Sequence, residues 1–169
     1  MRLLVLDVDG VLTDGTIFYT ANGEDLKAFH AQDGLGMKLL QKLGVEVAVI
    51  SGRTSAPLER RLDDLGITRR VLKCANKIEA LKGMAADLGV EFRDICFMGD
   101  DLIDIEAMEA CGYSVAPANA VESVRIIADF VTKKEGGHGA VREACEHLAF
   151  RMGHNLEAVA RNTTKVLVQ

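Results

Sequence analysis

Short apolar runs alternate along this chain with segments of helical periodicity, and this alternation constrains the fold more than any other feature. The apolar runs have the length of buried strands, while the segments between them place apolar side chains three or four residues apart, on one face of a helix. Strands and helices that alternate in this way form a parallel sheet joined by crossover helices. The sequence therefore predicts an α/β fold, a three-layer, doubly wound (Rossmann-like) parallel sheet. The expected strands are residues 3–7, 45–50, 70–72, 95–98, 113–116 and 130–132.

One segment, at about residues 15–31, interrupts the alternation directly after the first strand. It contains the pair Asn22-Gly23 between two β-prone stretches, which is a strong signal for a β-hairpin turn. A hairpin at this place projects from the end of the sheet as a flap, and it exposes apolar residues such as Phe18 and Tyr19 unless something covers them. We expect sister subunits to cover them. A hairpin folded over its own chain is the alternative.

Composition and charge limit the class of protein. The 169 residues are enough for one domain with one substantial core. The 20 lysines and arginines against 25 acidic residues give a net charge of −5, so we expect neither a nucleic-acid partner nor attraction to a membrane surface. We assign residues 1–152 to one domain and leave residues 153–169 as a C-terminal tail without an assigned role.

Two further features concern the cellular compartment. No apolar stretch has the length of a signal-peptide core or of a membrane span, which predicts a cytoplasmic location. The four cysteines are scattered without a C-x-x-C pair, so they indicate neither a zinc site nor a redox motif. Cys96 and Cys111 are interpreted as small core residues in a reducing compartment.

Polar residues follow four of the predicted strands. Asp7 and Asp9 follow the first strand, and Lys77 opens the helix after the third. The group Ser51–Arg53 follows the second strand, and Gly99–Asp104 follows the fourth. In open α/β sheets, ligands bind in the crevice at the carboxyl ends of the strands, so these residues are expected to share one neighbourhood.

The predicted crevice gathers more negative charge than a bare pocket tolerates. Asp7, Asp9 and Asp100 repel one another unless a cation lies among them, and Mg²⁺ is the divalent ion that binds few carboxylates and bridges to a phosphate. With the cation bound, one carboxylate can attack phosphorus, because the metal and nearby donors reduce its repulsion by the phosphate dianion. The sequence thus indicates phosphoryl-group chemistry.

Each of these motifs alone has an ordinary structural explanation. Asp-x-Asp-Gly and Gly-Asp-Asp are typical of turns, Ser51 of a helix cap, and Lys77 of a solvated helix surface. Their coincidence at four positions that the sheet brings to one crevice favours a shared functional site.

Four motifs resemble, in order, those of the haloacid dehalogenase-like phosphatases: "DVDGVLTDG", "ISGR", the helix-opening Lys77 and "MGDDLID". Four longer blocks are similar to the small branch without a cap domain that contains 3-deoxy-D-manno-octulosonate 8-phosphate phosphatase, and the similarity extends to about Leu148. This resemblance implies a Mg²⁺-dependent phosphomonoesterase that acts on a sugar phosphate in the pathway supplying lipopolysaccharide. The blocks are "DGTIFY", "FHAQDGLGMKLL", "SGRTSAPLERRLDDLGI" and "GGHGAVREACEHL".

The resemblance also implies roles for the acids. Asp7 would be the nucleophile that forms an aspartyl-phosphate, while Asp9 would protonate the leaving alkoxide and later activate water. Mg²⁺ would be held by Asp7, by the backbone carbonyl of Asp9 and by Asp100. Asp101 and Asp104 would support this metal site.

Other residues would bind the substrate. The resemblance implies that Ser51 and the amide of Gly52 bind phosphate oxygens and that Lys77 offsets negative charge. Arg53 can pair with the carboxylate of a keto-acid sugar and favours the eight-carbon substrate, since we expect glutamate here in phosphatases of nine-carbon, sialic-type 9-phosphates, the alternative substrate class. Arg61 resembles an arginine that reaches a neighbouring active site. Alternatively, both arginines are surface residues near a helix start.

The resemblance further implies a homotetramer, in which the hairpins form a central barrel and help to close a neighbour's pocket. The segment 133–143 resembles a C-terminal segment that folds over a site, with Gly136 and Gly137 providing backbone freedom. His138 or Arg142 would then meet substrate. Whether this segment closes its own or a neighbour's site is left open.

Two hypotheses in which the protein is not an enzyme compete with this interpretation. Receiver domains also carry an acid cluster, Mg²⁺ and an acceptor aspartate on a doubly wound sheet, but they place the acceptor on a middle strand of the sequence. Here the pair Asp7 and Asp9 follows the first strand. A structural partner without catalytic activity predicts no Mg²⁺-dependent phosphate release from any ester.

Overall fold

A parallel sheet forms the centre of the computed structural model, which describes residues 1–21 and 23–162. Within these residues the sheet has six strands in the order β5-β4-β1-β6-β7-β8, and every pair is parallel. The predicted strands are all present, with ends that differ by at most one residue. They are β1 (Leu3–Leu6), β4 (Glu46–Ile50), β5 (Arg69–Val71), β6 (Ile95–Met98), β7 (Tyr113–Ala116) and β8 (Phe130–Val131).

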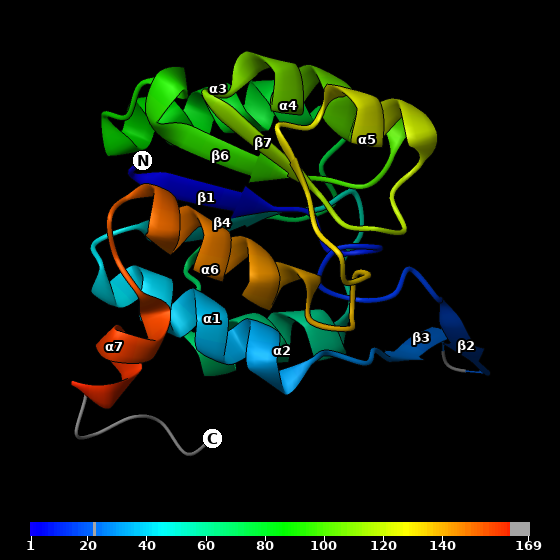
Figure 1. Cartoon of the computed structure of the whole chain (residues 1–169). Coiled ribbons are helices and arrows are strands. Elements are labelled where there is room, and N and C mark those ends of the chain that lie inside the picture. Colours follow the sequence, from blue (N-terminus) through cyan, green and yellow to red (C-terminus); the bar gives the residue numbers. More distant parts are fainter. Residues whose placement is uncertain (22, 163–169) are drawn as a thin grey trace.

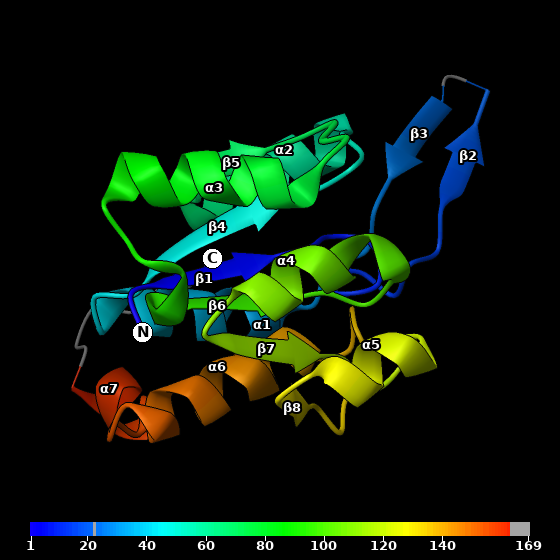
Figure 2. The ribbon, with the colours of Figure 1, turned by 90° about the horizontal axis from the view of Figure 1, so that it is seen from above.

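Helices cover both faces of the sheet, which gives three layers (Figures 1 and 2). The chain winds outward from β1 through β4 to β5, then returns to β6 and continues outward to β8, so the winding direction reverses between β1 and β6. This confirms the predicted doubly wound fold. One face is covered by α1 (Ala31–Lys42), α2 (Ala56–Leu65), α6 (Ala140–Arg151) and α7 (Leu156–Arg161), the other by α3 (Lys77–Leu88), α4 (Ile105–Ala110) and α5 (Glu122–Ile127).

The central strand β1 is buried on both faces. Leu4 and Leu6 pack into the core beneath α1, α2 and α6, while Leu3 and Val5 pack into the core beneath α3 and α4. Successive side chains of a strand point to opposite faces, so a strand covered on both sides needs a continuous apolar run. Asp7 is the first residue after this apolar run and lies at the carboxyl end of the strand, where it is still buried.

The hairpin of β2 (Phe18–Thr20) and β3 (Gly23–Leu26) projects from the carboxyl-end edge of the sheet (Figure 1). Phe18 is 41% exposed, Tyr19 71% and Leu26 56%, so the described part of this chain does not cover them. The predicted flap is confirmed. Asn22, on which the turn prediction depended, lies outside the described residues.

A further helix, α7, lies in the segment to which the sequence analysis assigned no element. Its first residue, Leu156, is buried, and Val159 and Ala160 pack against the same core cluster as α1 and α6. Asn155 caps the helix by accepting a hydrogen bond from the Ala158 amide at 3.0 Å. The remainder of the predicted tail, 163–169, lies outside the described residues.

The described chain holds no cap domain between its sheet and the solvent at the carboxyl-end edge; the connections there are short loops and the hairpin. None of the described helices is both long enough and apolar enough to cross a membrane.

Candidate active site

The reversal point of the sheet brings Asp7 next to Asp100. Strands β1 and β6 are neighbours, and the Asp7 amide continues their ladder by donating to the Met98 carbonyl at 3.0 Å. Asp100 follows β6 after one glycine. One carboxylate oxygen each from Asp7, Asp100 and Asp104 lies within 4.8 Å of the others. Residues far apart in sequence thus form one acidic cluster at the position where open α/β sheets bind ligands.

The Asp-x-Asp-Gly turn is shaped around Asp100. Gly10 has a φ of +90°, and a Cβ atom at this position would lie 2.0 Å from Oδ2 of Asp100. Only glycine combines this backbone conformation with so close an approach. The turn therefore does more than reverse the chain, because it brings the backbone after Asp9 against the second metal-ligand candidate.

Lys77 is buried in the middle of the acids. It is the first residue of α3, whose N-cap is Asn76, and its Nζ lies 2.9 Å from Oδ1 of Asp7 and 2.6 Å from Oδ1 of Asp104. Asp104 is fully buried, and its second oxygen accepts hydrogen bonds from the amides of Asp100 and Asp101. Asp104 thus fixes Lys77 and the loop that carries Asp100.

Burial and mutual repulsion perturb the ionisation of these groups. Burial, together with the charge of Asp104, raises the pKa of Asp7 to about 6, although Lys77 opposes the shift. Burial and the charges of Asp7 and Asp104 raise the pKa of Asp100 to about 7. Burial alone lowers the pKa of Lys77, but the attraction of Asp7 and Asp104 outweighs it, so that pKa is raised. Lys77 therefore stays charged, and the cluster still has excess negative charge at neutral pH.

A divalent cation fits this cluster. Oδ1 of Asp100 is buried and has no hydrogen-bond partner among the described residues, which is costly for a carboxylate unless it ligates an ion. Both oxygens of Asp104 are already engaged, so Asp7 and Asp100 are the side chains able to hold the ion directly. A site with two carboxylate ligands is the kind that Mg²⁺ occupies, since this ion binds few carboxylates and keeps several waters.

Because folding raises the pKa values of Asp7 and Asp100, the metal-free protein should lose stability as pH rises. Between the unfolded value of 3.8 and the folded values of about 6 and about 7, the native state binds more protons than the unfolded chain, so the free energy of unfolding falls with pH. Mg²⁺ binds the ionised carboxylates, so its stabilising effect should grow over the same range. Urea unfolding from pH 4 to 8, with chelator or Mg²⁺, measures both trends.

The variant Asp100→Asn is the control for this pH dependence. It removes one of the two raised carboxyls, so its metal-free stability should fall less steeply with pH, and Mg²⁺ should stabilise it less. An unchanged slope in the variant would contradict the assignment of the pH dependence to this cluster.

Asp9 lies beside the cluster but has different partners. Its Oδ1 is 2.5 Å from Nζ of Lys27, and its Oδ2 is 3.7 Å from Nε of Arg53. The Arg53 guanidinium also donates to the Tyr19 hydroxyl at 3.4 Å. The carboxylate of Asp9 therefore faces two cations instead of the other acids, while its backbone lies next to Gly10 and Asp100.

The group after β4 lies at the same edge of the sheet. Ser51 is buried, and its hydroxyl accepts a hydrogen bond from the Arg53 amide at 3.2 Å. Gly52 is exposed, with only the Cys74 carbonyl near its missing Cβ position, at 3.7 Å. The amide of Gly52 and the O–H of Ser51 are the kind of donors that bind phosphate oxygens.

Three of the residues that the sequence indicated as site candidates are not part of the acidic cluster. Asp101 is exposed and caps the short 3₁₀ helix η2 (Leu102–Asp104) through the Leu102 amide at 2.7 Å, which is a structural task beside the cluster. Arg61, on α2, donates to the His30 carbonyl at 3.5 Å and does not join the acidic cluster of its own chain. Arg142 pairs with Glu146 on α6 at 2.6 Å.

The glycine-rich segment before α6 packs against the Asp-x-Asp-Gly loop. The Gly137 amide donates to the Val11 carbonyl at 3.2 Å, and the Gly136 amide donates to Asn119 at 2.7 Å. A Cβ on Gly136 would lie 1.8 Å from the Gly10 carbonyl oxygen, so this glycine permits close packing as well as backbone freedom. His138, the next residue after Gly137, is exposed.

Lys27 is the site residue that the sequence analysis missed. It lies just after β3, where the hairpin returns to the body of the domain, and it is only 9% exposed. No motif marks it, because its proximity to Asp9 depends on the length and path of the whole hairpin. A lysine directly after a β-prone strand is equally typical of a solvated strand end.

Comparison with known proteins shows the family to which the chain is similar. Residues 71–143 match the model of a family described as haloacid dehalogenase-like hydrolase. The chain is 44% identical to the 3-deoxy-D-manno-octulosonate 8-phosphate phosphatase of Escherichia coli over 158 residues, which cover 94% of this chain and 84% of that protein. It is 42% identical to the phosphatase of the same name from Haemophilus influenzae, over 90% of this chain and 85% of that one.

The chain is also similar in fold and sequence to solved structures. The cobalt-bound deoxy-D-mannose-octulosonate 8-phosphate phosphatase of Haemophilus influenzae superimposes with a TM-score of 0.88 at 42% identity, covering 90% of each chain. The Moraxella catarrhalis 3-deoxy-D-manno-octulosonate 8-phosphate phosphatase, in complex with a magnesium ion, a phosphate ion and a KDO molecule, has a TM-score of 0.91 at 39% identity, covering 96% of this chain and 92% of that one.

Proposed function

The chain belongs to the haloacid dehalogenase-like hydrolases, in the capless branch that contains the 3-deoxy-D-manno-octulosonate 8-phosphate phosphatases, and we propose that its acidic cluster is the active site of such an enzyme. The enzyme is a Mg²⁺-dependent phosphomonoesterase that releases the free eight-carbon sugar acid and phosphate. The cluster of Asp7, Asp100 and Asp104 around Lys77 is the observation that carries the proposal, because it combines a metal site with a carboxylate able to attack phosphorus.

In the first half of the reaction, a carboxylate oxygen of Asp7 attacks phosphorus. The bond between phosphorus and the sugar oxygen breaks, and Asp9 gives a proton to that oxygen as it leaves. The different partners of the two acids support this division of roles. Asp7 lies in the cluster, 2.9 Å from Lys77, whereas the carboxylate of Asp9 turns away toward Lys27 and Arg53.

In the second half, water hydrolyses the aspartyl-phosphate. Asp9, now ionised, takes a proton from the water molecule. The water oxygen bonds to phosphorus, and the bond between phosphorus and Asp7 breaks. Phosphate leaves, and both acids return to their starting states. A second carboxylate two residues after the nucleophile therefore serves both half-reactions.

The remaining residues hold the phosphoryl group. Mg²⁺, when bound by Asp7, Asp100 and the backbone carbonyl of Asp9, supplies positive charge to the phosphate oxygens. Lys77 adds a fixed positive charge beside Asp7, and Ser51 and the Gly52 amide donate hydrogen bonds. Asp104 and Asp101 keep Lys77 and the loop of Asp100 in place.

Arg53 is proposed to bind the carboxylate of the sugar acid. It stands between Asp9 and Tyr19, at the edge of the site, where a guanidinium can form a bidentate pair with a carboxylate. Arg61 lies away from the cluster in its own chain, which supports the interpretation that it reaches the site of a neighbouring subunit.

We further propose a homotetramer in the cytoplasm. The exposed apolar side chains of the hairpin, above all Phe18 and Tyr19, support burial against sister subunits. The four cysteines are free thiols, which supports a reducing compartment.

Phosphate release from a panel of sugar phosphates tests the function. The eight-carbon keto-acid 8-phosphate should be the preferred ester, and chelation of Mg²⁺ should abolish its hydrolysis while added Mg²⁺ restores it. A preference for the nine-carbon 9-phosphate would replace the proposed substrate. Absence of Mg²⁺-dependent release from every ester would leave only a structural role for the protein.

A further inference from the structure

Lys27 is a buried lysine whose ammonium group lies against the acid–base candidate. Its side chain is 2% exposed, and its Nζ lies 2.5 Å from Oδ1 of Asp9. Lysine is rarely buried unless it is paired, and holding such a long side chain in one geometry costs conformational entropy. A position of this kind is unlike the solvated lysines on the helices, for example Lys42 at the end of α1, which is exposed.

The contact with Lys27 determines how the Asp9 carboxylate is turned. The terminal torsion of an aspartate has broad preferences, so the carboxylate can rotate at little cost. In this site an unrestrained carboxylate would be drawn toward a bound cation, because Asp9 belongs to the loop that would hold the metal ion. Lys27 occupies Oδ1, and Oδ2 is left facing Arg53, the proposed partner of the substrate carboxylate.

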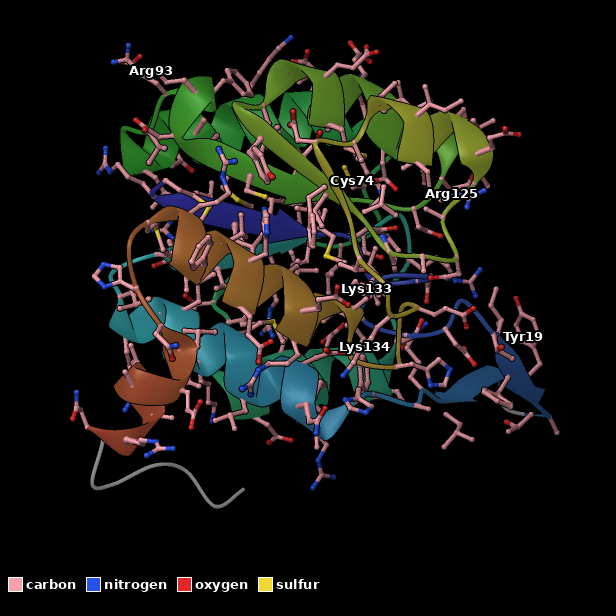
Figure 3. The ribbon with its side chains drawn as sticks, viewed as in Figure 1. Tyr19, Cys74, Arg93, Arg125, Lys133 and Lys134 are labelled. Atoms are coloured by element: carbon pink, nitrogen blue, oxygen red, sulfur yellow. The ribbon has the colours of Figure 1, made fainter. Side chains whose placement is uncertain are left out.

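We propose that Lys27 is a positioning residue that fixes Asp9 with Oδ2 directed toward the oxygen of the leaving sugar. This inference rests on the proposed phosphatase function and extends it to a residue outside the four motifs. Two cations face Asp9, and the hairpin is linked to both. Lys27 directly follows strand β3, and Tyr19 on strand β2 contacts Arg53. Figure 3 shows Tyr19 on the projecting hairpin, away from the sheet. The hairpin thus helps to shape the active site of its own chain.

The reactivity of the leaving group separates positioning from a general structural effect. An alkoxide needs a proton to leave, whereas para-nitrophenolate leaves without one. The ratio kcat/KM covers the steps up to release of the alcohol, so it reports on this proton transfer. Lys27→Met should lower kcat/KM for the sugar phosphate about 10- to 100-fold, which is part of the roughly 10²- to 10⁴-fold that general acid catalysis usually contributes, and lower it only slightly for para-nitrophenyl phosphate.

Three further comparisons make the test decisive. In an Asp9→Asn background, Lys27→Met should cause little additional loss, because a residue that acts through Asp9 has nothing left to position. Lys27→Arg, which keeps the charge and the donor, should restore part of the sugar-phosphate activity. Lys42→Met, a change of the same kind on an exposed helix end, should match the wild type with both esters.

Equal losses of kcat/KM for both esters in Lys27→Met would overturn the proposal, as would full additivity of Lys27→Met with Asp9→Asn. If Lys27→Met does not fold, the double variant, which removes both charges of the pair, and Lys27→Arg still decide it by the same comparisons. A wild-type enzyme that fails to hydrolyse the sugar phosphate would instead refute the underlying function.

Discussion

Replacing Asp7 by asparagine should abolish turnover of every phosphate ester while leaving the protein folded. An amide has the shape of the carboxylate but is not a nucleophile toward phosphorus, so no aspartyl-phosphate forms. We expect kcat to fall by at least about 10⁴-fold, as for the loss of other covalent nucleophiles. Phosphate release under saturating Mg²⁺ and substrate measures the effect.

The same variant should not be less stable than the wild type in the presence of chelator. Asp7 is buried against Asp104 and Asp100, and the raised pKa of about 6 shows that its ionised form is disfavoured there. Removing this charge relieves repulsion, so the midpoint of urea unfolding should stay or rise. Sedimentation should show the same assembly as the wild type, and Asp87→Asn, on the exposed side of α3, should keep full activity. Residual turnover in Asp7→Asn would reject the assigned nucleophile.

The layered fold was predictable because its pattern is local. Strand β1 is covered on both faces, so it has to be apolar at every position from Leu3 to Leu6, and the helices beside it repeat their apolar residues on one face. The convergence of Asp7 and Asp100 also followed from the sequence, because the rule for doubly wound sheets places the ends of neighbouring strands together.

Other parts depend on contacts that no local pattern encodes. Helix α7 is short, and the burial of Leu156 becomes evident only once α1 and α6 form the surface that receives it. Lys27 meets Asp9 only because the hairpin projects and returns over 18 positions of the chain. The link between Asp104 and Lys77 was missed for a related reason: the sequence shows two motifs, but not which acid of "GDDLID" points inward.

The buried pair with Asp104 makes Lys77 as important for stability as for catalysis. Lys77→Met keeps an unbranched side chain of nearly the same length but leaves Asp7 and Asp104 buried without their shared cation. Removing one partner of a buried ion pair typically costs about 3–5 kcal/mol, and we expect a loss of that size in chelator. Turnover should also fall, by about 10²- to 10³-fold, because a fixed positive charge beside the reacting phosphoryl group is lost.

The expected recovery distinguishes this electrostatic cause from a packing defect. Adding Asp7→Asn to Lys77→Met removes one uncompensated charge, so the double variant should be more stable than Lys77→Met alone. Lys82→Met is the matched control on the same helix, since Lys82 forms an exposed pair with Glu79, and it should change the free energy of unfolding by about 1 kcal/mol or less. Urea unfolding of the four proteins provides the comparison. If Asp7→Asn does not restore stability to Lys77→Met, the loss arises from packing around the methionine, and the lysine is not what lets these acids lie together.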